Sequence, residues 1–397
     1  MKKVFLTVAL LLASAVVSAQ YYKDAHNVDM LHVRQPRTQC RTELRMPDVD
    51  GYKAIKADLH THTVFSDGGM NMESRVKEAW FDGLDVMAVT EHLEYRPSEK
   101  QWVKYLKGYT DGAEASDYSF VSENRPASAA NIKADLNYPV EVARKEASKY
   151  GITIIPGIEI TRKEGEYCHF NALFTTDNNA IYAPETIESV RNAKKQGALV
   201  MHNHPGWKHK DLNLTEYEKM IYKENLIDGI EIMNGAEFYP KAIDRAIKHN
   251  LFMAACTDIH YITSTSYANF GVLRNMTIIF AKDSSLESLR EALDAKRTIA
   301  YSYGVLAGSE ELLSKFVSAC ITCEFMTLDY KQRPIYKLTN NSSVEYCFSA
   351  DGHNLVNLPA NSSITVRVDK KGASLNLVFE NVWCSSNKFL TLTVTPK

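Results

Sequence analysis

Histidine and acidic residues in this sequence gather in short motifs that could bind metal ions. The first is Asp58-Leu59-His60-Thr61-His62, which ends an apolar run and is followed by Asp67. Side chains two residues apart on an extended segment point to the same side, so His60 and His62 can contact one cation. The pair alone is weak evidence, because histidines that are packed for other reasons also produce this spacing.

Further motifs of this kind stand at the ends of later apolar runs. In α/β folds the C-terminal ends of parallel strands come together, so groups that are far apart in sequence converge there. Random scatter of 12 histidines would not place most of them at such ends. The sequence therefore predicts a polynuclear metal site. The later motifs are Thr90-Glu91-His92, Gly157-Ile158-Glu159, Cys168-His169-Phe170, His202-Asn203-His204-Pro205-Gly206 and Thr257-Asp258-Ile259-His260.

The ligand types predict the chemistry of this site. Mixed imidazole and carboxylate ligands suit Zn, Mn or Fe better than Mg or Ca, which prefer oxygen ligands. Clustered cations lower the pKa of bound water and clamp the attacking and leaving oxygens of a displacement at phosphorus, so the expected nucleophile is a metal-bound hydroxide. The sequence has no Gly-rich phosphate loop followed by Lys and Ser or Thr, so nucleotide-driven phosphoryl transfer has no support.

In these motifs and their order, about residues 54–303 resemble the PHP (polymerase and histidinol phosphatase) metallophosphoesterases. The resemblance implies a distorted (β/α)7 PHP-type barrel that holds about two to three divalent transition-metal ions (Mn, Zn or Fe) and hydrolyses phosphate esters. The signal peptide and the β-rich tail described below are most similar to exported phosphodiesterase-like members, including those that act on organophosphate esters.

The resemblance also implies which residues bind each ion. Many family members with three metals have histidine where Asp67 stands, so the third site is the least typical. The first ion is expected at His60, His62, Glu159 and Asp258, a second at Glu159, His169 and His204, and a third at Asp67, His92 and His260.

Three other residues are weaker candidates. Arg96 could clamp a phosphoryl oxygen, but an ion-paired arginine would look the same in sequence. Trp207 could stack on an apolar ester group or could be a packed aromatic residue. His202 shares a strand face with His204, which favours support of a ligand over direct binding.

The elements that must position these residues follow from hydrophobic periodicity. Apolar runs alternate with amphipathic helical stretches between residues 54 and 301, which is typical of parallel strands joined by helices and favours a barrel over an open sheet. We expect one helix to begin after Asn71 and end at Gly83, and another to begin at Pro139 and end at Gly151. The strands are expected at residues 54–59, 85–90, 152–160, 170–174, 198–201, 229–233 and 252–257.

Two regions have a different texture. Residues 97–138 lack periodicity and are rich in Tyr, so we expect a segment that covers the metal site and offers aromatic surface to an ester substituent. From residue 331 onward short alternating runs, such as 363–368 and 375–379, predict a small C-terminal antiparallel β domain.

The N-terminus predicts export. Lys2 and Lys3 precede an apolar run at residues 4–17, and Val17-Ser18-Ala19 supplies the small residues of a cleavage site. The run is shorter than the ~20 residues that span a bilayer, so we expect no integral membrane segment after cleavage and a bacterial periplasmic location. The expected organisation is a signal peptide at 1–19, an extension at 20–53, the barrel at 54–308 and the β-rich domain at 309–397.

Composition excludes some functions. The chain has 397 residues, of which 45% are hydrophobic, and 46 basic against 48 acidic residues give a net charge of −2. This composition is that of a globular protein, and no basic excess is present to neutralise a nucleic-acid backbone, so a nucleic-acid partner is disfavoured. Nothing in the sequence indicates an oligomeric state.

The sequence therefore predicts an exported metal-dependent phosphoesterase, with a phosphodiesterase favoured, that acts on a small-molecule phosphate ester. One alternative is a phosphomonoesterase of the histidinol-phosphate type, although a periplasmic location would separate it from cytoplasmic biosynthesis. The other alternative is a non-catalytic, metal-dependent binding protein for phosphorylated ligands. Such a protein would be expected to have a broken ligand set, whereas every expected position here carries a competent ligand.

Overall fold

The computed structural model describes residues 40–96, 135–162, 168–350, 352, 354–368 and 374–395. The predicted signal peptide at 1–19, most of the extension at 20–53 and residues 97–134 of the predicted covering segment lie outside the described residues. These three expectations therefore stay predictions.

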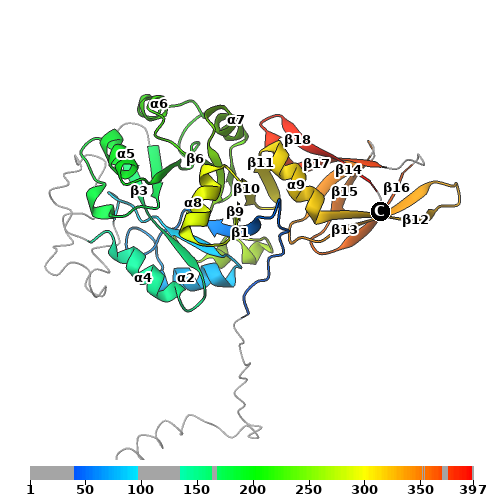
Figure 1. Cartoon of the computed structure of the whole chain (residues 1–397), viewed down its shortest axis with the longest axis horizontal. Coiled ribbons are helices and arrows are strands. Elements are labelled where there is room, and N and C mark those ends of the chain that lie inside the picture. The colour runs from blue at the N-terminus through cyan, green and yellow to red at the C-terminus, as the bar shows by residue number, and fades with distance from the viewer. Residues whose placement is uncertain are drawn as a thin grey trace, which may run out of the picture. The chain divides into compact units, whose positions relative to one another are not determined.

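A large mixed sheet forms the centre of the molecule (Figure 1). It begins with the parallel strands β1 (Lys53–Asp58), β2 (Val86–Val89) and β3 (Thr153–Arg162). The sheet continues through β4 (Cys168–Leu173), β5 (Leu199–His202), β6 (Gly229–Asn234) and β7 (Glu237–Phe238), and β8 (Phe252–Cys256) pairs with β6. On the other side β1 pairs with β9 (Met276–Ala281), which leads to β10 (Thr298–Ser302) and β11 (Val305–Gly308).

Two strands of this sheet, β9 and β4, do not run parallel to their neighbours as expected. Strand β9 runs antiparallel to β1, and β4 runs antiparallel to both β3 and β5. In the β3–β4 ladder Thr161 is opposite His169, and in the β4–β5 ladder Phe170 is opposite His202. The beginning of β4 therefore lies at the sheet edge where β3 and β5 end.

The predicted distorted (β/α)7 barrel is not confirmed, because the sheet formed by the described residues does not close. Among the described residues, β8 forms a backbone ladder with β6 only. Its other side is bonded by threonine side chains: the Met253 N–H donates to Thr298 Oγ1 (3.1 Å), and Thr277 Oγ1 bonds both the N–H (3.1 Å) and the carbonyl (3.0 Å) of Ala255. These side chains occupy the backbone groups of β8 that a closing ladder would need.

Alternate residues of the strands face a separate inner core. Ile55, Ala57 and Leu59 of the first strand segment pack there with the equivalent residues of β2, β3, β5, β8 and β9. Leu289 and Leu293 of α8 (Leu286–Asp294) pack into the same core. The period of two thus gives each strand one face toward this core and one toward the surrounding helices.

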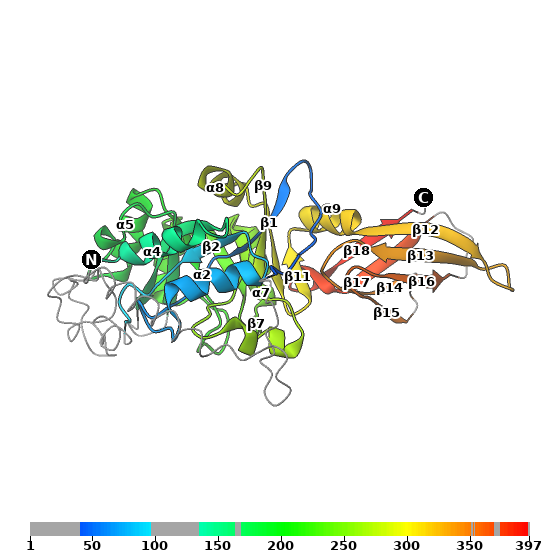
Figure 2. The same ribbon diagram turned by 90° about the horizontal axis from the view of Figure 1, so that it is seen from below.

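The helices lie on the outside of these strands (Figures 1 and 2). Helix α2 (Met72–Phe81) begins as predicted, because Asn71 accepts a hydrogen bond from the Ser74 N–H (2.8 Å), and Gly83 follows its end. Helix α4 (Tyr138–Ala147) has the predicted Pro139 in its first turn. The other α-helices among the described residues, besides α8, are α5 (Thr186–Lys195), α6 (Glu216–Lys223), α7 (Pro240–His249) and α9 (Glu310–Cys320).

The last quarter of the chain is rich in strands, as predicted, but it continues the main sheet. Strand β17 (Leu375–Ser385) pairs in parallel with β11 and antiparallel with β14 (Tyr346–Ala350) and β18 (Lys388–Val394). Strand β15 (Leu355–Leu358) pairs with β14, and β12 (Ile321–Leu328), β13 (Pro334–Asn340) and β16 (Ser363–Arg367) form a second, antiparallel sheet. A separate C-terminal domain is therefore not confirmed, and the boundaries at 54–308 and 309–397 stay predictions.

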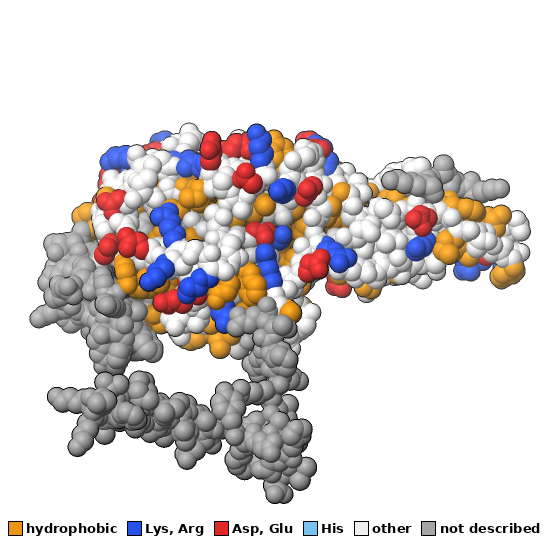
Figure 3. Space-filling view, turned by 60° about the horizontal axis from the view of Figure 1, so that its bottom comes forward, with side chains coloured by type: hydrophobic (Ala, Val, Ile, Leu, Met, Phe, Trp, Pro, Cys, Tyr) orange, Lys and Arg blue, Asp and Glu red, His pale blue; other side chains and the backbone are white. Residues whose placement is uncertain are grey.

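The surface agrees with the balanced composition. On the face shown in Figure 3, Lys and Arg side chains are interspersed with Asp and Glu side chains. No helix in the described part of the chain is long and apolar enough to cross a membrane.

Candidate metal centre

The fold brings all nine predicted ligands to one edge of the sheet. His60, His62 and Asp67 follow β1, His92 follows β2, and Glu159 lies near the end of β3. His169 is the second residue of β4, and the antiparallel direction of that strand places it beside Thr161 at the same edge. The remaining residues, His204, Asp258 and His260, follow β5 and β8.

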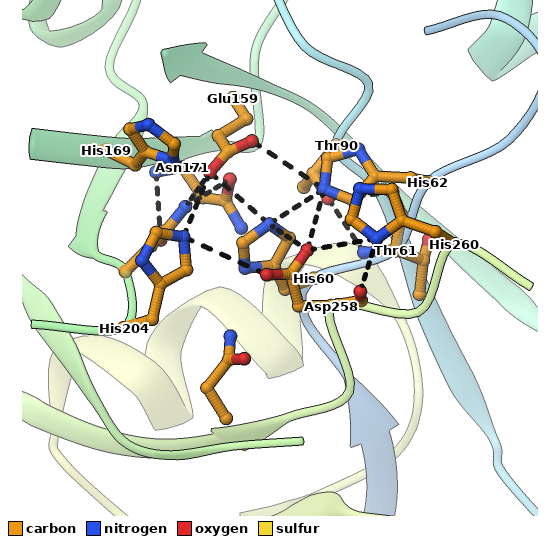
Figure 4. A network of polar contacts seen from close by, with 12 residues as sticks. His60, Thr61, His62, Thr90, Glu159, His169, Asn171, His204, Asp258 and His260 are labelled. Atoms are coloured by element: carbon orange, nitrogen blue, oxygen red, sulfur yellow. Dashed lines mark hydrogen bonds and ion pairs between the residues drawn. The ribbon is translucent and has the colours of Figure 1, made fainter. Parts of the chain in front are cut away.

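The donor atoms of these residues form three groups, within each of which all donors lie within 4.8 Å of one another. Figure 4 shows Glu159 and Asp258 between the histidines. The three groups resemble the predicted ligand sets, with His62 shared between two of them. The groups are His60, His62 and Asp258; Glu159, His169 and His204; and His62, Asp67, His92 and His260.

The first group is centred on Asp258. Its Oδ1 atom lies 3.0 Å from His62 Nε2 and 3.3 Å from His60 Nε2, and the two imidazole nitrogens are 3.0 Å apart. Asp258 has a φ of 50°, in the left-handed region that aspartate and asparagine adopt more readily than other residues with a side chain.

The second group is centred on the fully buried Glu159. Its Oε1 atom lies 3.2 Å from His169 Nδ1, 3.6 Å from His204 Nε2 and 3.4 Å from His60 Nε2. Its Oε2 atom lies 2.5 Å from His92 Nδ1. Glu159 therefore faces all three groups at once, which is the position that the predicted bridging role requires.

The third group surrounds Asp67. Its Oδ2 atom lies 3.1 Å from His260 Nε2 and 3.3 Å from His92 Nε2. The ring of His62 stacks between these two imidazoles, with ring centroids 4.3 Å from His92 and 4.4 Å from His260. Asp67 therefore contacts both of the histidines that were predicted to share its site.

The protonation states fit metal binding. Burial and the neighbouring His92 and His260 lower the pKa of His62 to about 3. Burial acts to raise the pKa of Glu159, but His92, His60 and His169 hold it well below its usual value. His62 is therefore neutral and Glu159 ionised at pH 7, which are the forms that coordinate metal ions.

Two other histidines of the centre, His60 and His92, carry protons where metal ions would otherwise supply the positive charge. Burial acts to lower the pKa of His60, yet Asp258, Glu231 and Glu159 raise it well above its usual value. The pKa of His92 is likewise raised, against burial, by Asp67 and Glu159. The carboxylates thus create a demand for positive charge that bound metal ions would meet while releasing these protons.

Unbonded buried atoms support the same fit. In the described part of the chain, Glu159 Oε2 and His169 Nδ1 are buried without a hydrogen bond of good geometry, although each faces an opposing donor or acceptor. Buried polar atoms in native proteins are nearly always bonded, and a metal ligand is one explanation of an exception. The residues present therefore fit Zn, Mn or Fe ions.

Comparison with known proteins agrees with this geometry. The sequence pattern of the PHP domain matches residues 58–353. The chain belongs to the PHP domain family. It also resembles the crystal structure of a two-domain protein from Bacteroides vulgatus that contains a predicted PHP-like metal-dependent phosphoesterase, with 34% identity over 90% of this chain and 99% of the other and a TM-score of 0.76. No curated protein is significantly similar to the chain.

Two weaker likenesses carry no weight for function, because their TM-scores are below 0.5. A candidate metal-dependent phosphoesterase from Bifidobacterium adolescentis is 14% identical, over 62% of this chain and 97% of that one, with a TM-score of 0.39. A lesion-specific endonuclease from Pyrococcus furiosus is 15% identical, over 65% of this chain and 59% of that one, with a TM-score of 0.36.

Buried residues that were not predicted from the sequence motifs hold the metal centre in place. The Asn203 amide donates to Glu159 Oε1 and to Asn171 Oδ1, both at 2.9 Å. Glu91 accepts hydrogen bonds from Thr63 and from Ser66. Asn203 and Glu91 stand inside the metal-binding motifs, so their position in the sequence is a signal that could have found them.

Two further supporting residues lie outside any motif. Arg274 forms an ion pair with Asp58, at 2.6 Å, and Glu231 lies 2.8 Å from His60 Nδ1. All of these side chains are buried. No local pattern marks Arg274 or Glu231, and only the folded structure identifies them.

The structure also places the three weaker candidates. Arg96 is buried, and its Nη1 donates to the carbonyl of His92 (3.1 Å), so its contact with a phosphate stays a prediction. The Trp207 ring lies against two predicted ligands, with centroid distances of 5.2 Å to His169 and 5.3 Å to His204. His202 bonds Glu218 Oε1 through Nε2 (2.7 Å) and is in none of the three groups.

Proposed function

We propose that this PHP protein is an exported metal-dependent phosphodiesterase that hydrolyses small phosphate diesters. The observation that carries the hydrolase assignment is the convergence of nine imidazole and carboxylate donors into three groups. The preference for a diester is supported by aromatic side chains beside these groups.

The metal ions would be held by the residues already described. One ion would be bound by the first group, which is His60, His62 and Asp258. A second ion would be bound by Glu159, His169 and His204, and a third by the group of His62, Asp67, His92 and His260. When bound, such ions lower the pKa of water toward neutrality and polarise phosphoryl oxygens.

The chain's own residues orient the ligands and exclude water. The Asn203 amide holds Glu159 Oε1 toward the histidines through a hydrogen bond of 2.9 Å. Glu159, His60 and His62 are fully buried, so their charges and lone pairs act in a medium of low polarity, where they are stronger than in water.

 With 28% of its side chain exposed, against 21% for Asp258, His260 is the one of the nine that solvent reaches most.

Aromatic residues next to the three groups offer surface for a second ester substituent. The exposed Tyr95 ring lies 5.6 Å from the ring of His92, and the half-buried Trp207 lies beside His169 and His204. Tyr261 directly follows His260 and is 69% exposed. A monoester needs no such surface, whereas the second organic group of a diester can pack on it.

The position of Lys208 supports the proposal that Trp207 contacts the second ester substituent of a diester. Its Nζ atom lies 4.2 Å from the centroid of the Trp207 ring. A cation next to an aromatic face beside two metal ligands suits an aryl ester whose phosphate carries negative charge. Binding energy from such a nonreacting group can be used in the transition state, so its loss should lower the rate as well as the affinity.

The test compares two nitrophenyl esters on protein reconstituted with Mn, Zn or Fe. We expect bis(p-nitrophenyl) phosphate to have a higher kcat/KM than p-nitrophenyl phosphate. Trp207→Ala should reduce the ratio of the two values by lowering the kcat/KM of the diester. Tyr330→Ala is the control, because Tyr330 is 84% exposed and lies on the strand-rich last quarter of the chain. Elemental analysis should find about two to three metal ions per chain.

Other outcomes of this test would favour the alternatives. A clearly faster monoester would favour the phosphomonoesterase of the histidinol-phosphate type. Metal-dependent binding of inorganic phosphate without hydrolysis of either ester would favour the binding protein. A single-stranded oligonucleotide in the same assay tests the expectation that nucleic acid is a poor substrate.

Export rests on the sequence of residues 1–19 alone. We expect a chain expressed with its own N-terminus in a Gram-negative host to be recovered from the periplasm with Gln20 as its first residue. Terminal sequencing of that material tests the proposal. An uncut chain that stays in the cytoplasm would contradict it.

A further inference from the structure

Glu231 is a buried carboxylate that no motif assigns and that faces the metal centre. It is the third residue of β6, and its side chain is fully buried. The register of β6 against β8 shifts between Glu231 and Met233, so β6 carries an extra residue at this point. Bulges of this kind re-aim side chains next to active sites.

Both carboxylate oxygens of Glu231 are used by groups of the centre. The Oε1 atom lies 2.8 Å from His60 Nδ1. The Oε2 atom accepts hydrogen bonds from the backbone N–H of His204 (2.6 Å) and from the side-chain amide of Asn234 (2.8 Å). One side chain thus joins a residue of the first ligand group to a residue of the second.

The contact at His60 fixes which ring nitrogen is free. Since a carboxylate oxygen can only accept, Nδ1 of His60 must carry the proton. Nε2 is then the nitrogen that a metal ion would bind after displacing the second proton, and it faces His62, Asp258 and Glu159, which lie 3.0, 3.3 and 3.4 Å away. A metal ion needs this tautomer, because it binds the unprotonated nitrogen.

The contact at His204 acts on the backbone. His204 has a φ of 22°, outside the conformations that residues with a side chain usually adopt. The hydrogen bond from its N–H to Glu231 Oε2 helps to hold this conformation, with Nε2 of His204 lying 3.6 Å from Glu159 Oε1.

We propose that Glu231 is a positioning residue that sets the metal affinity of the centre by orienting His60 and His204 together. It would contact no metal ion itself. The inference rests on the metal centre of the proposed function, and the experiment below separates the two.

Glu231→Gln is the decisive substitution because it keeps the size of the side chain. Glutamine has one acceptor oxygen and one NH2 donor, whereas the three contacts need acceptors at both ends. An NH2 toward His60 would move the imidazole proton to Nε2 and block metal binding there. An NH2 toward His204 would oppose two donors, so either orientation disturbs one ligand.

The matched control is Glu218→Gln. Glu218 is also a buried carboxylate on a histidine, His202, but neither residue belongs to the three ligand groups. The measurement is a titration of metal-free protein with Zn(II) or Mn(II) against a chromophoric chelator. Circular dichroism of each metal-free variant reports whether it folds.

We expect Glu231→Gln to raise the dissociation constant about 10- to 100-fold, with Glu218→Gln close to wild type. Equal affinities of wild type and Glu231→Gln would overturn the inference while leaving the proposed function intact. Failure of wild type to bind either metal would instead contradict the proposed function.

A measurement on the unaltered chain keeps the inference testable if Glu231→Gln does not fold. In zinc-loaded protein labelled with 15N-histidine, NMR distinguishes the two imidazole tautomers, and a His60→Gln variant identifies the His60 signals. We expect a proton on Nδ1 of His60. A proton on Nε2 would overturn the inference.

Discussion

Arg274 and Asp58 form a buried ion pair between residues 216 positions apart, with Arg274 Nη2 2.6 Å from Asp58 Oδ2. The same carboxylate accepts hydrogen bonds from Thr257 Oγ1 (2.5 Å) and from the backbone N–H of His60 (3.3 Å). Asp58 therefore joins the segment that carries His60 to the segment that carries Asp258, through its hydrogen bond from Thr257. The role of Arg274 is to neutralise the buried charge of the carboxylate that makes this connection.

Arg274→Met should destabilise the protein by about 3–5 kcal/mol, because it leaves the Asp58 carboxylate buried without its partner. Urea unfolding of metal-free protein measures the change. The control is Arg45→Met, whose pair with Glu43 is exposed and should contribute less than about 1 kcal/mol. A loss for Arg274→Met as small as that of the control would contradict the assigned role.

His62→Ala and Asp258→Asn should each lower phosphoesterase turnover by orders of magnitude, because each removes a donor of the metal centre. Asparagine tolerates the left-handed backbone of Asp258, so the second variant should keep its fold. Turnover, metal content and circular dichroism are measured together. Wild-type turnover in either folded variant would refute its assignment as a ligand.

Glu218→Gln should lower stability most near neutral pH. Burial acts to raise the pKa of Glu218, but His202 and Thr215 lower it to about 2, below the 4.5 of an unperturbed glutamate. A lowered folded-state pKa gives stability that is present above pH 4.5 and is lost as the pH falls toward 2. The gap of about 1–3 kcal/mol between wild type and variant at pH 7 should therefore shrink between pH 4.5 and 3 in urea titrations of metal-free protein. A gap that stays constant over that range would contradict the shifted pKa.

A chain that ends at residue 308 should be poorly soluble, although residues 309–397 supply none of the nine ligands. Strand β17 pairs with β11, and the Asn381 amide donates to the Gly304 carbonyl (2.7 Å), so truncation uncovers both an edge strand and apolar core. Expression and light scattering of the truncated and full chains test this. A truncated chain that stays folded and retains its metals, but hydrolyses no small ester, would show that the last quarter helps to form the active site.

Local sequence patterns predicted much of the centre because the ends of strands converge. His60, His92 and His204 each follow an apolar run, and that position places them at one edge of a sheet whatever the intervening helices do. The beginning of α2 was also predictable, since Asn71 bonds a backbone N–H only three residues away. Both signals are local, so neither needs knowledge of distant partners.

Strand direction and closure were decided by tertiary structure. The spacing of residues 152–174 predicts two strands but does not say that β4 turns back on β3, and this reversal is what brings His169 to the centre. The closing side of β8 is bonded by Thr277 and Thr298, which lie 22 and 45 residues from their partners and have no local signature.

The sequence by itself determined the donor types, their motifs and the strand ends that carry them, because these depend on neighbouring residues. Only the tertiary structure selected Glu231, which orients ligands, and Arg274, which neutralises the carboxylate that joins two of those segments. Their contacts with His60 and Asp58 span 171 and 216 positions. Interactions over such separations arise from the packing of the folded chain, and no periodicity in the sequence records them.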